Sequence, residues 1–196
     1  MKRGAWMGMV VVMMLAGIWS AKAAGQAAAG QATAAAPAQG ETVANPVSTT
    51  VKAMLGRFEK NMVGAAEAMP AEKYAYKPTA DMNSYGHLVM HIAQSNNLFC
   101  SKIAGQAAPE AKISEGDAKD KLVAALKESF AYCTTVLASA DDAKLGEPMV
   151  LFGNRPASRG AAMVVLAGSW TDHYATQAIY LRLNGILPPT AQPKKD

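Results

Sequence analysis

From residue 45 onward, apolar side chains recur every three or four positions, which is the spacing of one face of an α-helix. Four such stretches predict four amphipathic helices of similar length, joined by segments that contain proline and glycine. No segment alternates convincingly with the period of two that a half-buried strand requires. The pattern therefore predicts an all-α protein folded as a four-helix bundle.

Capping and helix-breaking residues define the ends of the first two helices. Asn45 is expected to cap the first helix, because a proline follows it at the first helical position. Pro70 then ends that helix. Either Asn83 or Ser84 can cap the second helix, and Gly105 is the expected C-terminal stop.

The third helix is expected to begin around Asp117, and the fourth is expected to cover residues 158–184. Between them, residues 146–160 contain proline and glycine at several positions and are interpreted as a loop. The bundle is thus expected to span residues 45–190, and residues 191–196 are expected to form a short C-terminal tail.

Residues 1–23 have the three parts of a secretory signal peptide. Lys2 and Arg3 are the positive part, and residues 7–18 are apolar. Ala21-Lys22-Ala23 has the small-x-small pattern of a cleavage site. The apolar run is shorter than the roughly 20 residues that span a bilayer. We expect an exported protein, periplasmic or secreted, that leaves the membrane after cleavage; an uncleaved N-terminal anchor is the alternative.

Residues 24–44 are mostly alanine, glycine and glutamine, and they are expected to form a flexible linker. The formal net charge of +4 partly reflects the export signal, because without its three basic residues the chain has 16 basic and 15 acidic side chains. No stripe of lysine and arginine with interleaved aromatic residues remains. Nucleic acid is therefore not an expected partner.

Short motifs on the second and fourth expected helices are shared with a known protein family. They are the run YGHLVMHIA at 85–93, the run NLFC at 97–100 and the run YLRLNGILPP at 180–189. In this order, they resemble the DinB/YfiT-like family. The resemblance implies an up-down-down-up bundle and a divalent metal held by three histidines, one from the second helix and two from the fourth. Some members of the family are transferases or isomerases that act with low-molecular-weight thiols.

Carried over residue by residue, the resemblance implies that His91 and His173 are ligands of Zn or Ni. Ser169 stands where the other ligand of the fourth helix is expected, and a neutral serine is a poor ligand for either ion. His87 lies one turn before His91, so its ring can converge on the same point and replace the missing imidazole. The alternative for each histidine is an ordinary packed or solvated position in the bundle.

Two functions are consistent with this resemblance. The first is a divalent-metal-dependent enzyme of the thiol-dependent transferase or hydrolase type with a degenerate metal site, where a metal-bound thiol or water is the nucleophile. The second is a non-catalytic bundle that has lost the metal and binds a small molecule or a partner. The sequence does not decide between them, and a homodimer is also an open alternative.

The topology that the resemblance implies also predicts a disulfide between Cys100 and Cys133. In that topology the second and third helices run parallel. Cys100 is about seventeen residues into its helix and Cys133 about sixteen, so at about 1.5 Å per residue they reach nearly the same level. Disulfides persist in the oxidising compartments that exported proteins enter. Two buried free thiols are the alternative.

Overall fold

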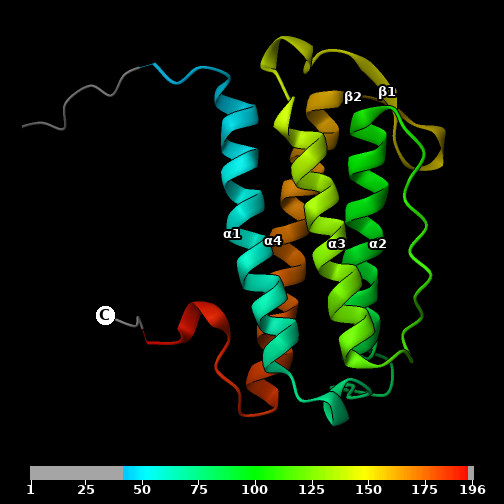
Figure 1. Ribbon diagram of the computed structural model, residues 1–196, viewed down its shortest axis with the longest axis vertical. Helices are drawn as coiled ribbons and strands as arrows, with labels where there is room; N and C mark the ends of the chain where they lie inside the picture. Colours follow the sequence, from blue (N-terminus) through cyan, green and yellow to red (C-terminus); the bar gives the residue numbers. More distant parts are fainter. Residues whose placement is uncertain (1–41, 194–196) are drawn as a thin grey trace, which may run out of the picture. The chain divides into compact units, whose positions relative to one another are not determined.

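The computed structural model describes residues 42–193, so the expected signal peptide and most of the expected linker lie outside the described residues. Four long helices form a bundle (Figure 1), which confirms the predicted fold class. They are α1 (Pro46–Ala68), α2 (Tyr85–Ala104), α3 (Lys119–Ala138) and α4 (Arg159–Leu183). The connections contain the short helices η1 (Ala71–Lys73), η2 (Asp142–Lys144) and η3 (Phe152–Asn154), and η4 (Pro189–Ala191) follows α4.

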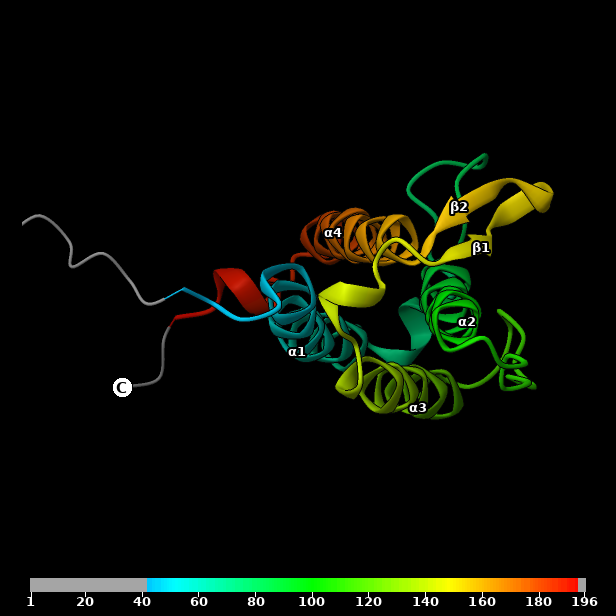
Figure 2. The same cartoon turned by 90° about the horizontal axis from the view of Figure 1, so that it is seen from above.

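Each long helix packs against two others, in the circular order α1, α3, α2, α4 (Figure 2). The expected disulfide between Cys100 and Cys133 joins α2 to α3 near the C-terminal ends of both helices, so these two helices run in the same direction. Gln177 Nε2 donates to the Met62 carbonyl near the C-terminal ends of α4 and α1, so these two also run together. Lys52 near the start of α1 reaches the last carbonyl of α3, so the two pairs run in opposite directions.

The start of α1 is capped differently from the sequence-based expectation. Asn45 has a left-handed backbone with φ of 49°, and its side chain does not cap the helix. Instead, the Asp142 carboxylate accepts the backbone N–H groups of Val47 at 2.9 Å and Ser48 at 2.8 Å. Asn45 Oδ1 in turn accepts the Asp142 N–H at 3.1 Å. The cap of α1 therefore comes from η2, which is distant in the sequence.

The other helix ends follow local sequence more closely. Ser84 caps α2 through its hydroxyl oxygen, and Gly105 ends α2 with φ of 68°. The third helix begins at Lys119 rather than around Asp117. The Asp117 carboxylate accepts the Ser114 N–H at 2.8 Å, within the turn that precedes the helix.

The expectation of a plain loop at 146–160 is wrong, because this stretch contains a small antiparallel hairpin. Its strands are β1 (Pro148–Val150) and β2 (Pro156–Ser158). At three residues each, they are too short to show alternation in the sequence. Phe152 between the strands packs edge-to-face on Phe99 of α2, with 5.1 Å between ring centroids.

The core lies between the apolar faces of the four long helices. Trp170 of α4 is fully buried there, with its ring centroid 6.4 Å from that of Phe58 and 6.3 Å from that of Phe130. Its Nε1 donates to Asn96 Oδ1 at 2.8 Å, and Asn96 Nδ2 donates to Ser129 Oγ at 3.0 Å. This network provides partners for polar groups that water cannot reach. Within residues 42–193, no helix is long and apolar enough to cross a membrane.

Candidate histidine site

The three histidines of the chain are on α2 and α4. His87 and His91 are one turn apart on α2, with nearly parallel rings and 6.3 Å between their centroids. His91 also faces His173 of α4, edge to face, with 4.9 Å between the ring centroids. We call these three residues, together with Ser95 and Ser169, the histidine seam.

A serine one turn away contacts each of the two facing rings. Ser169 Oγ lies 3.1 Å from His173 Nδ1, and Ser95 Oγ lies 3.4 Å from His91 Nε2. These contacts run along each helix rather than across the seam. One nitrogen of each facing ring is therefore beside a hydroxyl.

His87 is directed toward the connection between α2 and α3. Its Nδ1 lies 2.9 Å from Glu115 Oε2, and both side chains are partly exposed. The structure thus brings His91 and His173 together but holds His87 against a loop carboxylate. Within residues 42–193, no three histidine, cysteine, aspartate or glutamate side chains are grouped closely enough to hold a metal ion.

The surroundings of the seam favour neutral imidazole rings. His91 is exposed by its accessible surface, yet the partial burial of its ring lowers its pKa, and the positive charge that His87 can carry lowers it further. Burial also lowers the pKa of His173; the neighbouring His91 adds to this effect, and Asp172 opposes it. Both facing rings are therefore expected to be neutral at neutral pH, which is the form that accepts hydrogen bonds and binds metals.

The arrangement of these side chains does not fit a three-histidine metal centre. Such a centre needs three ring nitrogens at about 2.0–2.1 Å from one ion. The seam offers the two facing rings, while Ser169 supplies only a neutral hydroxyl and His87 is engaged with Glu115.

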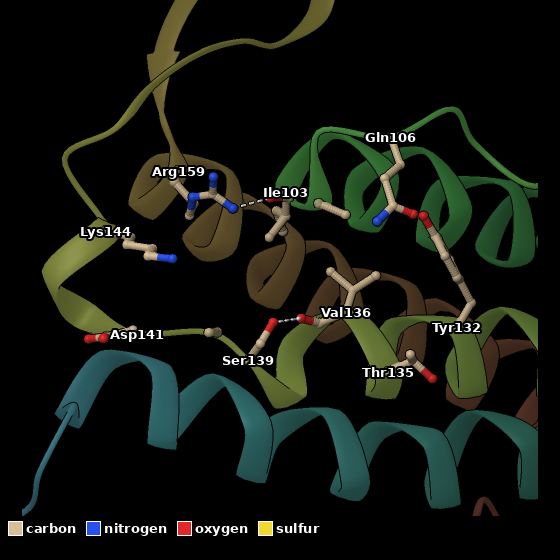
Figure 3. Close-up of a pocket in the computed structure, with 11 residues that line it drawn as sticks. Ile103, Gln106, Tyr132, Thr135, Val136, Ser139, Asp141, Lys144 and Arg159 are labelled. Carbon is tan, nitrogen blue, oxygen red and sulfur yellow. Dashed lines mark hydrogen bonds between the residues drawn. The ribbon is translucent and has the colours of Figure 1, made fainter.

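A separate cavity of about 360 Å³ lies where α2 and α3 end and α4 begins (Figure 3). Arg159 borders it, donating to the Ile103 carbonyl and, through Nη2, to Glu147 Oε2 at 2.6 Å. The Tyr132 hydroxyl is buried there and has no hydrogen-bond partner among the described residues. No sequence motif marks this cavity, because its lining comes from three helices and from the connections between them.

The protein is thus a four-helix bundle in which two imidazoles, one from α2 and one from α4, face each other. The sequence profile of the DinB superfamily matches residues 54–176, which is more than half of the chain. The chain therefore belongs to the DinB superfamily, and the family resemblance seen in the sequence is confirmed. No curated protein sequence matches the chain.

Solved structures show the same fold. The DinB-like protein YjoA of Bacillus subtilis is 21% identical with a TM-score of 0.59, and the match covers 74% of this chain and 99% of YjoA. A DinB-like protein of Bacillus cereus is 13% identical with a TM-score of 0.62, covering 72% of this chain and 95% of its own. YfiT of Bacillus subtilis is 14% identical with a TM-score of 0.58, covering 75% and 93%; it is described as a probable metal-dependent hydrolase with an unusual four-helix bundle topology.

Proposed function

We propose that this chain is an exported DinB-superfamily protein whose histidine seam binds a small polar molecule without a three-histidine metal centre. The observation that carries this proposal is the contact of Ser169 with His173, at the position where the family resemblance implies an imidazole. With a hydroxyl there, His91 and His173 are the two rings that face each other. Under this proposal, the ligand forms hydrogen bonds with the ring nitrogens that do not contact a serine.

The chemistry of the seam suits binding better than bond cleavage. Two neutral imidazoles and two hydroxyls offer both hydrogen-bond donors and acceptors to a small molecule. A serine–histidine hydrolase would also need donors that stabilise an oxyanion. The backbone N–H groups beside Ser169 are in the middle of α4, where the helix itself uses them. The Ser169–His173 pair therefore has no backbone oxyanion hole beside it.

A second candidate is a divalent-metal-dependent enzyme, of the thiol-dependent transferase or hydrolase type, that uses Zn or Ni. The contact between His87 and Glu115 favours it. A carboxylate that accepts the Nδ1–H of a histidine leaves Nε2 as the free ligand atom, which is the usual arrangement behind metal-bound histidines. The description of YfiT as a probable metal-dependent hydrolase is consistent with this candidate.

Titration of metal-stripped protein with Zn²⁺ and with Ni²⁺ in a calorimeter separates the two functions. The proposal predicts no stoichiometric uptake of either ion at micromolar concentrations. The matched variants are His91→Ala and His173→Ala, with the exposed Gln94→Ala on α2 as the control. Stoichiometric binding that both histidine variants abolish and Gln94→Ala retains would support the metal enzyme and refute the proposal.

Ligand binding is tested by the ring signals of His91 and His173 in NMR spectra. A set of small polar fragments, added one at a time, should include members that shift both ring signals together. The His91→Ala variant should weaken binding of the same fragments, and Gln94→Ala should not. If no fragment shifts either ring, or if fragments bind equally to His91→Ala, the seam is not the binding site.

Export is part of the proposal and is supported by the pattern of residues 1–23. The disulfide between Cys100 and Cys133 also suits an oxidising compartment. N-terminal sequencing of the protein from separated cell fractions should give a mature chain that begins near Ala24. An intact N-terminus recovered from the membrane fraction would contradict export as a free protein.

A further inference from the structure

Exposed apolar side chains continue the histidine seam at one of its ends. On α4, Val165 precedes Ser169 by four residues, just as Ser169 precedes His173. On α2, Leu98 follows Ser95 by three residues. Side chains three or four residues apart share a helix face, and α2 and α4 run in opposite directions, so Leu98 and Val165 lie beyond the serines at the same end. They are 37% and 42% exposed.

The β1–β2 hairpin adds a third apolar side chain at this end. Phe152, between the strands, is 42% exposed, and its ring packs on that of Phe99 of α2. Phe99 and Val165 are each eight residues from the facing histidine of their own helix, so they lie at one level of the two helices. Figure 2 shows the hairpin on the side of α2 and α4 that faces away from α1 and α3. We call Leu98, Val165 and Phe152 the apolar end of the seam.

The centre of the seam offers hydrogen bonds rather than charge. The facing rings of His91 and His173 each lie beside a serine hydroxyl. The Glu115 carboxylate is engaged by His87, and Asp172, next to His173 in sequence, points about 100° away around α4. An anionic head would be repelled by both carboxylates, and a cationic head would compete with His87 for Glu115. The centre therefore suits an uncharged head that donates and accepts hydrogen bonds.

We propose that the ligand of the seam is an uncharged amphiphile, whose polar head bonds to His91 and His173 and whose apolar group covers the apolar end. This inference rests on the proposed function and adds the class of ligand to it. An exposed apolar patch rimmed by polar side chains is typical of an interaction site. A protein partner would need about 20–30 residues on each side of the interface. Three side chains instead match one small apolar group, which leaves water when the ligand binds.

A series of amides with a common head tests the apolar end. Acetamide, butanamide and hexanamide are titrated into the mature, oxidised protein, and the ring signals of His91 and His173 are followed by NMR. Full burial of a methylene strengthens binding about fourfold. A chain that lies on a surface is covered on one side, so each added methylene should strengthen binding about twofold, and hexanamide should bind roughly 15-fold more tightly than acetamide. Equal dissociation constants would refute the apolar end and leave the proposed function standing.

Charged probes with the same chain test the head. Hexanoate and hexylamine replace the amide of hexanamide by a carboxylate and by an ammonium group. Both should bind more weakly than hexanamide at neutral pH, because a charged head loses its hydration without gaining a free opposite charge at the rings. Tighter binding of either charged probe would show that the head is not an uncharged group.

Two adjacent valines of α4 provide a matched pair of variants. Val165 is at the apolar end, whereas Val164 is 62% exposed and lines an apolar groove against α1. Val165→Ser should weaken the binding of hexanamide and leave that of acetamide unchanged, and Val164→Ser should change neither. Circular dichroism checks that both variants are folded. A folded Val165→Ser variant that binds hexanamide as tightly as wild type would contradict the placement of the apolar group.

The His91→Ala variant separates this inference from the proposed function on which it rests. Loss of amide binding in this variant, with a dependence on chain length in the wild type, would support both. Hexanamide that binds His91→Ala as tightly as wild type would refute the proposed function, because the apolar end alone would then be the site. Absence of any ring shift with hexanamide at about 20 mM, above the millimolar range of weak binding, would refute both.

Discussion

Reducing the disulfide between Cys100 and Cys133 should lower the free energy of unfolding by about 3–4 kcal/mol at 25 °C. The two cysteines are 33 residues apart in sequence, and closing a loop of that length removes about this much chain entropy from the unfolded state. Both residues are fully buried between α2 and α3. Reduction makes the two sulfur atoms separate from bonding distance to van der Waals contact, so any crowding that this causes in the core adds to the loss.

The comparison is made by urea unfolding of oxidised and reduced wild-type protein, followed by circular dichroism. The reduced protein should have a lower midpoint and a steeper dependence on urea, because its unfolded chain is less constrained and exposes more surface. For a domain of this size the melting temperature should fall by about 10 °C. The Cys100→Ala, Cys133→Ala double variant should lose more than the reduced wild type, since it also leaves empty space in the core.

A loss of stability below about 1 kcal/mol on reduction would refute this reasoning, because the loop-entropy term could not then be the main effect. A second contradictory outcome is an unchanged dependence on urea. That result would mean that the unfolded chain stays compact around α2 and α3 whether or not the bond is closed.

Three further substitutions test the packing and capping described above. Gly86→Ala should destabilise the protein, because its Cβ would lie 2.6 Å from a backbone carbonyl oxygen. The Cβ of Gly56→Ala meets nothing within 4 Å, so this substitution should stabilise α1 by up to about 1 kcal/mol. Thermal unfolding compares the two variants. Asn96→Ala should lose about 1–3 kcal/mol in urea unfolding, because the indole N–H of Trp170 is left buried without its acceptor; an unchanged midpoint would contradict this. Burial opposes ionisation of Asp142, but hydrogen bonds from the first turn of α1 lower its pKa below the usual 3.8. The contribution of Asp142 to the free energy of unfolding is therefore present above pH 3.8 and is lost as the pH falls through the lowered pKa. Asp142→Asn should flatten the acid dependence of the melting temperature.

Features that depend on local sequence were predictable. The four helices follow from apolar spacing, and Ser84 and Gly105 end α2 by contacts with their own neighbours. The pairing of Cys100 with Cys133 was also predictable once a topology was assumed, because helical rise places both at one level. The helix predictions need only the periodicity of a helix and the residues at its ends, whereas the cysteine pairing also needs the topology that the family resemblance implies.

Features that depend on the paths of the connecting loops were not predictable. The cap of α1 comes from Asp142, which no local pattern connects to residue 45. In the same way, the spacing of His87 and His91 indicates that their rings can converge. It does not show that the loop after α2 brings Glu115 to 2.9 Å from His87. The path of that loop, rather than the helix, decides where the His87 ring points.

The bonds that join Asn45 and the first turn of α1 to Asp142 determine where the independently folding unit has to begin. The Asn45 carbonyl accepts the Thr49 N–H, and its side chain holds the turn that caps α1. A truncated chain that starts at Ala44 keeps all of these bonds, whereas one that starts at Pro46 loses an anchor of α1 and an anchor of the α3–α4 connection together. Proteolysis on either side of Asn45 should therefore have very different effects on the same bundle.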